Sequence, residues 1–348
     1  MTKKTRYFLA GSAGVLAAGL SIGLVAYYTG GFQPVSASAV STELRYVPSD
    51  ATVVAYADVR AIMDSELRAR LKQAMPMHDE KGQQEFQQQT GIDIEHDIDY
   101  VVAAMSPKVG MPVEGGGLVV ARGRFNDAQL ESLAREHGGT VEDYKGKRLV
   151  VSPAIHGEAE APVQMNGKSI VLAFLEPGLV AVGDSATVKA AIDAQMSAHS
   201  ITANDEMMQL VGDIGSGNNA WAVGRFDLLA SQAKLPEQIS RQIPPVKWFA
   251  VAGHVNGGLS GTVRAEARDE QSAENLRDVV RGFLALARLQ TQADPRTAGL
   301  VESLQMTGTG KTVQLSFAVP AEILQMIPKG QPGQPAELPK ELHETHPR

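Results

Sequence analysis

Apolar and polar residues alternate with a period of two along several short segments, a pattern typical of strands with one buried face. The clearest case is residues 259–268, where one face carries Val263, Ala265 and Ala267 and the other carries Thr262, Arg264, Glu266 and Arg268. Further strands are predicted at residues 51–59, 100–105, 117–125, 141–144, 148–152, 170–175, 179–183, 221–226, 248–255 and 313–319. One buried and one wet face favours antiparallel sheets.

Helical periodicity appears between these strands, each time after a residue that can cap a helix. Asn126 precedes a helix that should end at Gly138, and Asp184 or Ser185 precedes a second helix. Asp269 precedes a longer helix, reaching about residue 291. Its apolar stripe consists of Leu276, Val279, Val280, Phe283, Leu284 and Ala287. Its polar face, with Arg277, Asp278, Arg281 and Arg288, is expected to be solvated.

Three dipeptides predict hairpin turns between neighbouring strands. They are Lys145-Gly146, Pro177-Gly178 and Asn256-Gly257. Links this short force the flanking strands to pair in antiparallel fashion. We therefore predict an α+β fold of antiparallel sheets with helices packed on one face.

A weak internal echo suggests two related units, residues 46–200 and 201–328. The tetrapeptides Gly123-Arg124-Phe125-Asn126 and Gly224-Arg225-Phe226-Asp227 each end an apolar strand and begin a helix. Paired surface charges are the simpler interpretation of Arg124 and Arg225, and equivalent binding sites are the alternative.

Residues 1–30 have the pattern of an export or anchoring element. Lys3, Lys4 and Arg6 precede an uncharged, largely apolar run over residues 7–28, long enough as a helix to span about 30 Å of hydrocarbon. We predict an uncleaved single-pass helix in the bilayer of the cell membrane. A secretory signal peptide cleaved near Ala37-Ser38-Ala39 is the alternative. Because the positive charges precede the run, the body should lie on the extracytoplasmic, periplasmic side.

Two further segments flank the predicted body. Residues 31–45 are predicted to form a linker, and residues 329–348 a polar, proline-rich, disordered tail.

Composition narrows the chemistry available to the body. Its 43% hydrophobic residues can form a core, and the absence of cysteine excludes disulfides, thiolate zinc sites and thiol nucleophiles. A net charge of -7 disfavours nucleic acid as a partner, since binding to a phosphate backbone needs clustered Lys and Arg.

Several motif-like segments do not meet the requirements of the sites they resemble. Residues 308–312, Gly-Thr-Gly-Lys-Thr, lack the first glycine of a phosphate-binding loop and precede a strand, so we predict a hairpin turn and no nucleotide. The acidic run Asp93, Glu95, Asp97 and Asp99 has Ile98 where a calcium loop needs glycine, and a capped helix start or a solvated turn is predicted instead. The eight histidines show no zinc spacing, although His343 and His346 in the tail could bind metal weakly. We predict no catalytic, cofactor or metal site.

Residues 46–51, Tyr-Val-Pro-Ser-Asp-Ala, open the first predicted strand behind the N-terminal anchor. Together with the repeated strand, helix and hairpin units, they resemble exported, membrane-anchored bacterial proteins known only as a domain of unknown function. The resemblance implies an exported α+β protein and no specific activity. The sequence favours a noncatalytic envelope protein that binds another protein or a ligand. The alternatives are an exported hydrolase with a dispersed active site and a carrier of an apolar molecule.

Overall fold

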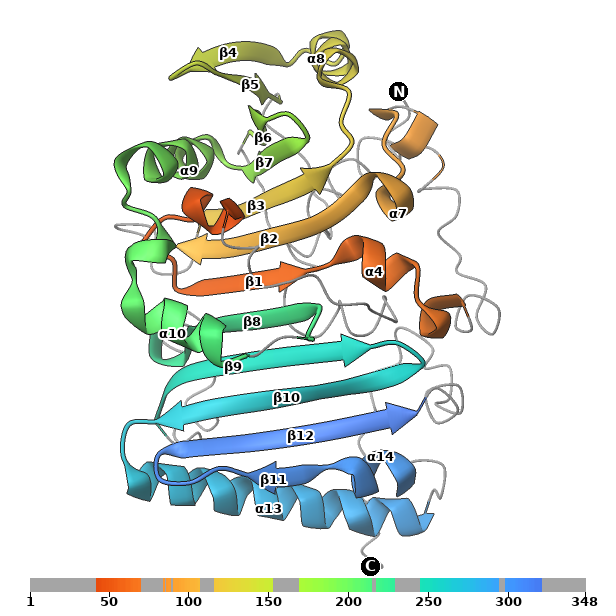
Figure 1. Cartoon of the computed structure of the whole chain (residues 1–348), viewed down its shortest axis with the longest axis vertical. Coiled ribbons are helices and arrows are strands. Elements are labelled where there is room, and N and C mark those ends of the chain that lie inside the picture. The colour runs from red at the N-terminus through yellow and green to blue at the C-terminus, as the bar shows by residue number, and fades with distance from the viewer. Residues whose placement is uncertain are drawn as a thin grey trace, which may run out of the picture.

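The computed structural model describes residues 42–69, 84, 86–88, 90–106, 116–152, 169–214, 217–228, 245–293 and 298–320. In these residues the chain forms one mixed α+β structure around a single antiparallel sheet of twelve strands (Figure 1). The strand order is β11-β12-β10-β9-β8-β1-β2-β3-β7-β6-β5-β4. The strands are β1 (Val53–Ala57), β2 (Ile98–Ser106), β3 (Gly116–Gly123), β4 (Thr140–Tyr144), β5 (Lys147–Val151), β6 (Val171–Glu176), β7 (Leu179–Gly183), β8 (Ala220–Arg225), β9 (Val246–Val255), β10 (Gly258–Ala267), β11 (Gln305–Thr307) and β12 (Thr312–Pro320).

Helices cover both faces of the sheet, so the prediction of helices on one face only is wrong. The α-helices are α4 (Val59–Met63), α7 (Ile94–Asp97), α8 (Asp127–Glu136), α9 (Ser185–Ser197), α10 (Asp205–Asp213), α13 (Glu270–Ala293) and α14 (Ala298–Ser303). Two short 3-10 turns, η1 (Leu44–Tyr46) and η2 (Ile201–Ala203), lie with α9 and α10. Helices α4, α7 and α8 lie on the opposite face.

Consecutive strand residues belong to two separate cores because their side chains point to opposite faces. Val102 and Val120 pack with Val188 of α9 and Met207 of α10, whereas Val101 packs with residues of α4 and α8 on the other face. A strand enclosed in this way carries apolar residues at successive positions. The burial pattern of β1, in which all five residues are buried, is the result.

The two predicted units share this one sheet, joined where β1 pairs with β8 from Val53↔Gly224 to Ala57↔Ala220. Outward from that seam the strands run β1-β2-β3-β7-β6-β5-β4 on one side and β8-β9-β10-β12-β11 on the other. The two Gly-Arg-Phe segments do not occupy matching places in these series. Gly123 ends β3, the third strand outward from the seam, whereas Gly224 lies near the end of β8, the first strand on the other side. Duplication of the units stays a prediction.

The predicted turns and caps are confirmed. Lys145 (φ 52°) and Gly146 (φ 77°) form the two-residue link of β4 and β5. The Asn126 side chain accepts a hydrogen bond from the Gln129 amide at the start of α8, and Asp184 does the same for Thr187 in α9. These contacts depend on residues close in sequence, which is why the local pattern was sufficient to predict them.

The predicted alternation in β10 is present, but its apolar face is only partly covered. Val263 is 40% exposed, and the neighbouring Leu315 of β12 is half-buried. Helix α13 packs on this region through Ala273 and Leu276, whereas Phe283 further along the helix is 68% exposed. The apolar stripe of α13 is therefore wider than the part that the sheet covers.

A buried carboxylate fixes the start of the described chain to the sheet. Glu43 is 1% exposed, and its Oε1 accepts hydrogen bonds from Tyr100 Oη at 2.9 Å and Arg122 Nη2 at 2.6 Å. Burial and the Glu43 carboxylate raise the pKa of Tyr100. Tyr46, three residues further along the same segment, donates from Oη to Glu176 Oε1 at 2.8 Å. Residues 43–46 are thus held on β2, β3 and β6 by polar contacts as well as by apolar packing.

Several predictions fall on residues outside the described ranges. These are the membrane helix, the linker up to residue 41 and the disordered tail. In the described part of the chain, no helix combines the length and the apolar character needed to cross a membrane.

Candidate functional site

The acidic run that resembles a calcium loop forms the short helix α7 and its cap. The Asp93 side chain accepts a hydrogen bond from the Glu95 amide at 2.9 Å, and the Asp97 carboxylate reaches back to the Asp93 amide at 2.8 Å. These reciprocal bonds satisfy amides that a helix start leaves without partners. Of the two predicted alternatives, a capped helix start and a solvated turn, the structure shows the capped helix start. No group of three or more metal-ligating residues occurs within the described ranges.

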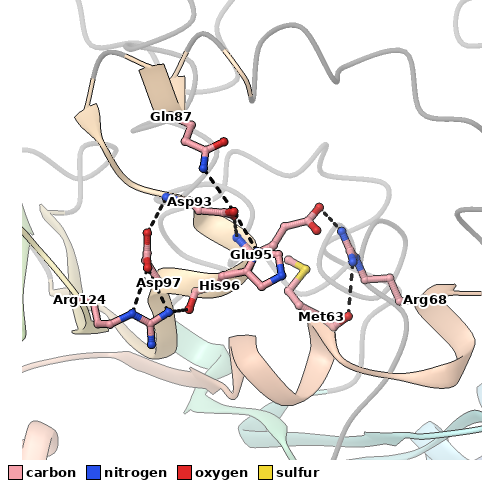
Figure 2. Close-up of polar contacts among 8 residues, drawn as sticks. All are labelled: Met63, Arg68, Gln87, Asp93, Glu95, His96, Asp97 and Arg124. Carbon is pink, nitrogen blue, oxygen red and sulfur yellow. Dashed lines mark hydrogen bonds and ion pairs between the residues drawn. The ribbon is translucent and has the colours of Figure 1, made fainter.

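Asp93 also collects side-chain donors (Figure 2). Its Oδ2 lies 2.8 Å from His96 Nδ1 and 3.4 Å from Gln87 Nε2. Burial by itself would raise the pKa of Asp93, but the hydrogen bonds from His96 and from the Glu95 amide outweigh it and hold that pKa below its ordinary value. Asp93 is therefore an ionised centre around which α7 is ordered.

Two arginines attach α7 to elements that are distant in sequence (Figure 2). Arg124, just after β3, donates from Nε to Asp97 Oδ1 at 3.1 Å and from Nη2 to the His96 carbonyl. Arg68, beyond α4, pairs with Glu95 and donates from Nη1 to the Met63 carbonyl at 3.3 Å. Because Arg68 and Glu95 are only 14% and 15% exposed, that pair is well shielded from water. Helix α7 is held from both sides.

An open cleft of about 560 Å³ lies beside this network. Its lining consists of Gly91, Asp97, Gly123, Arg124, Phe125, Asn126, Gln129 and Gly178. The cleft thus combines the α7 corner, the β3–α8 junction and the β6–β7 turn. Its charged residues are Asp97 and the 60% exposed Arg124, which pair with each other.

Close backbone contacts explain the glycines of the cleft. A Cβ on Gly123 would lie 2.1 Å from the Asp97 carbonyl oxygen, and one on Gly178 would lie 2.8 Å from the Gly123 carbonyl oxygen. Gly178 also has a φ of 70°, a conformation that L side chains rarely adopt. The three walls can approach one another only because these positions lack side chains.

The arrangement can bind a ligand through hydrogen bonds and one exposed guanidinium. Arg124 offers donors in a planar fork, and Gln129, also in the lining, offers an amide group. The His96 ring is 69% exposed and is oriented by its contact with Asp93. The same Asp93 carboxylate also caps α7. The geometry therefore favours recognition of a polar group on a partner.

The structure separates the two arginines of the Gly-Arg-Phe segments. Arg124 lines the cleft, whereas Arg225 pairs with Asp227 at 2.9 Å and stacks over the Trp248 ring at 5.4 Å. The hydrogen bond with Asp227 raises the pKa of Arg225. Residues 308–312 form the predicted hairpin turn, between β11 and β12. His137 caps the end of α8, its Nδ1 lying 2.7 Å from the Leu133 carbonyl oxygen.

Sequence reasoning did not predict the cleft, because its walls are far apart in the chain. Gly91 and Gln129 approach so closely that a Cβ on Gly91 would lie 2.6 Å from the Gln129 side chain. The available signals were local: Gly91 follows Thr90, Gly178 follows Pro177 in a predicted turn, and Arg124 follows a strand. None of them indicates which segments meet.

Comparison with known proteins gives little more. No family model matches the chain, and no curated protein matches it. Among solved structures, one described as "Structure of crystal form I of TP0453" has a TM-score of 0.40 and 11% identity, covering 81% of this chain and 94% of that chain. A similarity this weak supports no conclusion about the function of the chain.

Proposed function

We propose that this protein is a noncatalytic, membrane-anchored protein of the extracytoplasmic side whose body binds another envelope protein. The observation that carries the proposal is the open cleft at the α7 corner, with Arg124 exposed at its edge. Its walls are ordered before any partner arrives, since Asp93, Asp97 and Arg68 fix α7 on both sides. A prearranged site loses less entropy on binding than a flexible one.

The charge of the cleft indicates what part of a partner it would accept. Arg124 Nε and Nη2 already serve Asp97 and the His96 carbonyl, so the guanidinium is oriented while its edge stays exposed. Guanidinium groups bind carboxylates in a bidentate geometry. We therefore propose an acidic side chain or chain terminus of the partner as the group bound here.

The proposed N-terminal anchor determines the compartment in which this binding takes place. The apolar run over residues 7–28 follows three positive charges, which supports a cytoplasmic N-terminus and an exported body. A reporter fused after Ile327 should be active only outside the cytoplasm. Activity of the reporter in the cytosol would contradict this part of the proposal.

Crosslinking in intact cells followed by mass spectrometry tests the partner. We expect reproducible crosslinks between a second envelope protein and residues around the cleft, reduced at least about tenfold by Arg124→Glu, since reversing one charge in a charge pair costs several kcal/mol. Arg135→Glu is a matched control, because Arg135 is also 60% exposed and lies on α8, outside the cleft lining. Equal losses with both variants, or no reproducible partner, would refute the proposal.

A further inference from the structure

Helix α13 exposes an apolar surface that no described part of the chain covers. The exposed fractions are 39% for Val279, 68% for Phe283, 59% for Leu286 and 62% for Leu289. We refer to these four residues as the α13 stripe. Single exposed apolar residues are common on proteins, but four on one side of a helix form a contiguous patch of the kind that marks interaction sites.

The α13 stripe is separate from the contact between α13 and the sheet. The helix packs on Ala267 and Val313 through Ala273 and Leu276, near its first turns. Figure 1 shows α13 running along β11 at the end of the molecule away from β4. Two of its arginines are engaged elsewhere: Arg277 donates to the Thr312 carbonyl at 3.1 Å, and Arg281 pairs with Glu274 at 2.9 Å. The surface is thus available and uncharged.

The spacing of this surface is that of a helix that pairs with another helix. Val279, Phe283 and Leu286 follow one another at intervals of four and three residues. Apolar residues at these intervals form the seam of a coiled coil, in which each side chain fits between four residues of the facing helix.

Gly282 is a second, independent indication that another helix packs against α13. It lies inside α13, where glycine weakens a helix relative to alanine, and a Cβ added there would meet no atom within 4 Å. Nothing in the described chain therefore requires a glycine at this position. A second backbone approaching the helix closely would require it, since only glycine leaves that space free.

We propose that the α13 stripe docks against the α13 stripe of a second copy of this chain, in an antiparallel pair related by a two-fold axis. The largest side chain, Phe283, and the empty position, Gly282, are adjacent at the middle of the surface. An antiparallel two-fold places Phe283 of each copy over Gly282 of the other, and Val279 opposite Leu286. A parallel pair would set Phe283 against Phe283 and leave the glycine positions empty.

The exposed area indicates a weak, reversible dimer. The four side chains expose roughly 400 Å², taking about 150 to 250 Å² for one large apolar residue. Standard interfaces bury about 800 Å² on each partner. Association should therefore depend on concentration, and confinement of both copies to one membrane would strengthen it. The pairing itself does not depend on the proposed cleft partner.

Cysteine crosslinking tests the pairing cleanly, because the natural chain contains no cysteine. In the full-length chain in intact cells, the double variant V279C/L286C should form a disulfide-linked dimer on oxidation. The two positions are about 10.5 Å apart along one helix, too far for a bond within a chain. The matched pair E274C/R281C has the same spacing on the polar face and should form none.

Gly282→Leu separates pairing from folding. In one chain its side chain enters open space and favours the helix, so the melting temperature should stay unchanged or rise. Added to V279C/L286C, it should reduce the disulfide-linked dimer at least about tenfold, since the leucine occupies the space of Phe283. Gly212→Leu in α10, where a Cβ also meets no atom, should leave the dimer unchanged.

The possible outcomes distinguish this inference from its alternatives. Equal crosslinking of the two faces, no dimer from V279C/L286C, or a dimer insensitive to Gly282→Leu would each overturn it. Strong dimers from V279C alone would indicate a parallel pair and would also overturn it. Crosslinks from the α13 stripe to a different protein, or to lipid alone, would assign the surface to that partner. Failure of the cleft experiment would not affect these results.

Discussion

The stability of α7 should depend on pH through the ionisation of Asp93. Its carboxylate caps the helix and accepts hydrogen bonds from His96 and Gln87, and its pKa is held below the ordinary value of 3.8. A group with a lowered folded pKa stabilises the fold above its unfolded pKa and loses that effect as pH falls through its folded pKa. The α7 corner should therefore weaken below about pH 4 and stay unchanged between neutral pH and pH 5.

Asp93→Asn tests this dependence. The amide oxygen can still accept from the Glu95 backbone, so the variant removes mainly the charge. In urea denaturation the variant should be less stable than the natural protein at pH 7, and the difference should shrink at pH 3. Asp50→Asn provides a control at an exposed position. A difference that is as large at pH 3 as at pH 7 would show that the carboxylate charge does not order the helix.

Among the individual elements, α9 ends in an unfavourable conformation. Ala198, its C-cap, has a φ of 57°, in the left-handed region where a Cβ is strained. Ala198→Gly should raise the stability of the protein by about 0.5 to 1 kcal/mol. The exposed Ala190 lies inside the same helix, and Ala190→Gly should lower stability by a similar amount, about 1 kcal/mol. Chemical denaturation measures the change in the free energy of unfolding for both variants. Changes of the same sign would contradict the assignment of Ala198 as a left-handed C-cap.

The accuracy of the sequence predictions follows the range of the interactions behind each element. The caps Asn126 and Asp184 and the turn Lys145-Gly146 depend on neighbours within four residues, and all were predicted. Helix α10 is an exception: its cap, in which the Asn204 side chain accepts from the Met207 amide, and the spacing of its buried Met207 and Leu210 are local signals, yet it was not predicted. The second helical layer was missed because Val101 and Val102 contact different layers, which a run of apolar residues cannot reveal.

The candidate site was even less accessible from sequence. A capped helix start was one of the two forms predicted for its acidic run, yet the partner Arg68 lies 27 positions before Glu95, and Arg124 lies 27 positions after Asp97. Only the packing of α4 and β3 around α7 brings these groups together. Similarly, the exposed α13 stripe has the same sequence pattern as a buried helix face.

The whole molecule depends on one central seam, because β1 and β8 join the two halves of the sheet. Val223 of β8 is completely buried in the same core as Val54 of β1 and Val188 of α9. Val223→Ala removes buried methyl groups at the seam and should lower stability by about 2 kcal/mol. Since the backbone ladder is continuous from β11 to β4, we expect the two halves to unfold together.

Hydrogen exchange measured by mass spectrometry checks this cooperativity. In the Val223→Ala variant, the amides of β2 and β3 should lose as much protection as those of β9 and β10, although β2 and β3 lie on the far side of β1. Val263→Ala is the comparison, because Val263 is 40% exposed and its truncation should change protection little. Protection lost only in β9 and β10 would mean that the halves open separately. Equal losses would mean that the proposed binding site at the α7 corner and the proposed pairing surface on α13 belong to one cooperative body.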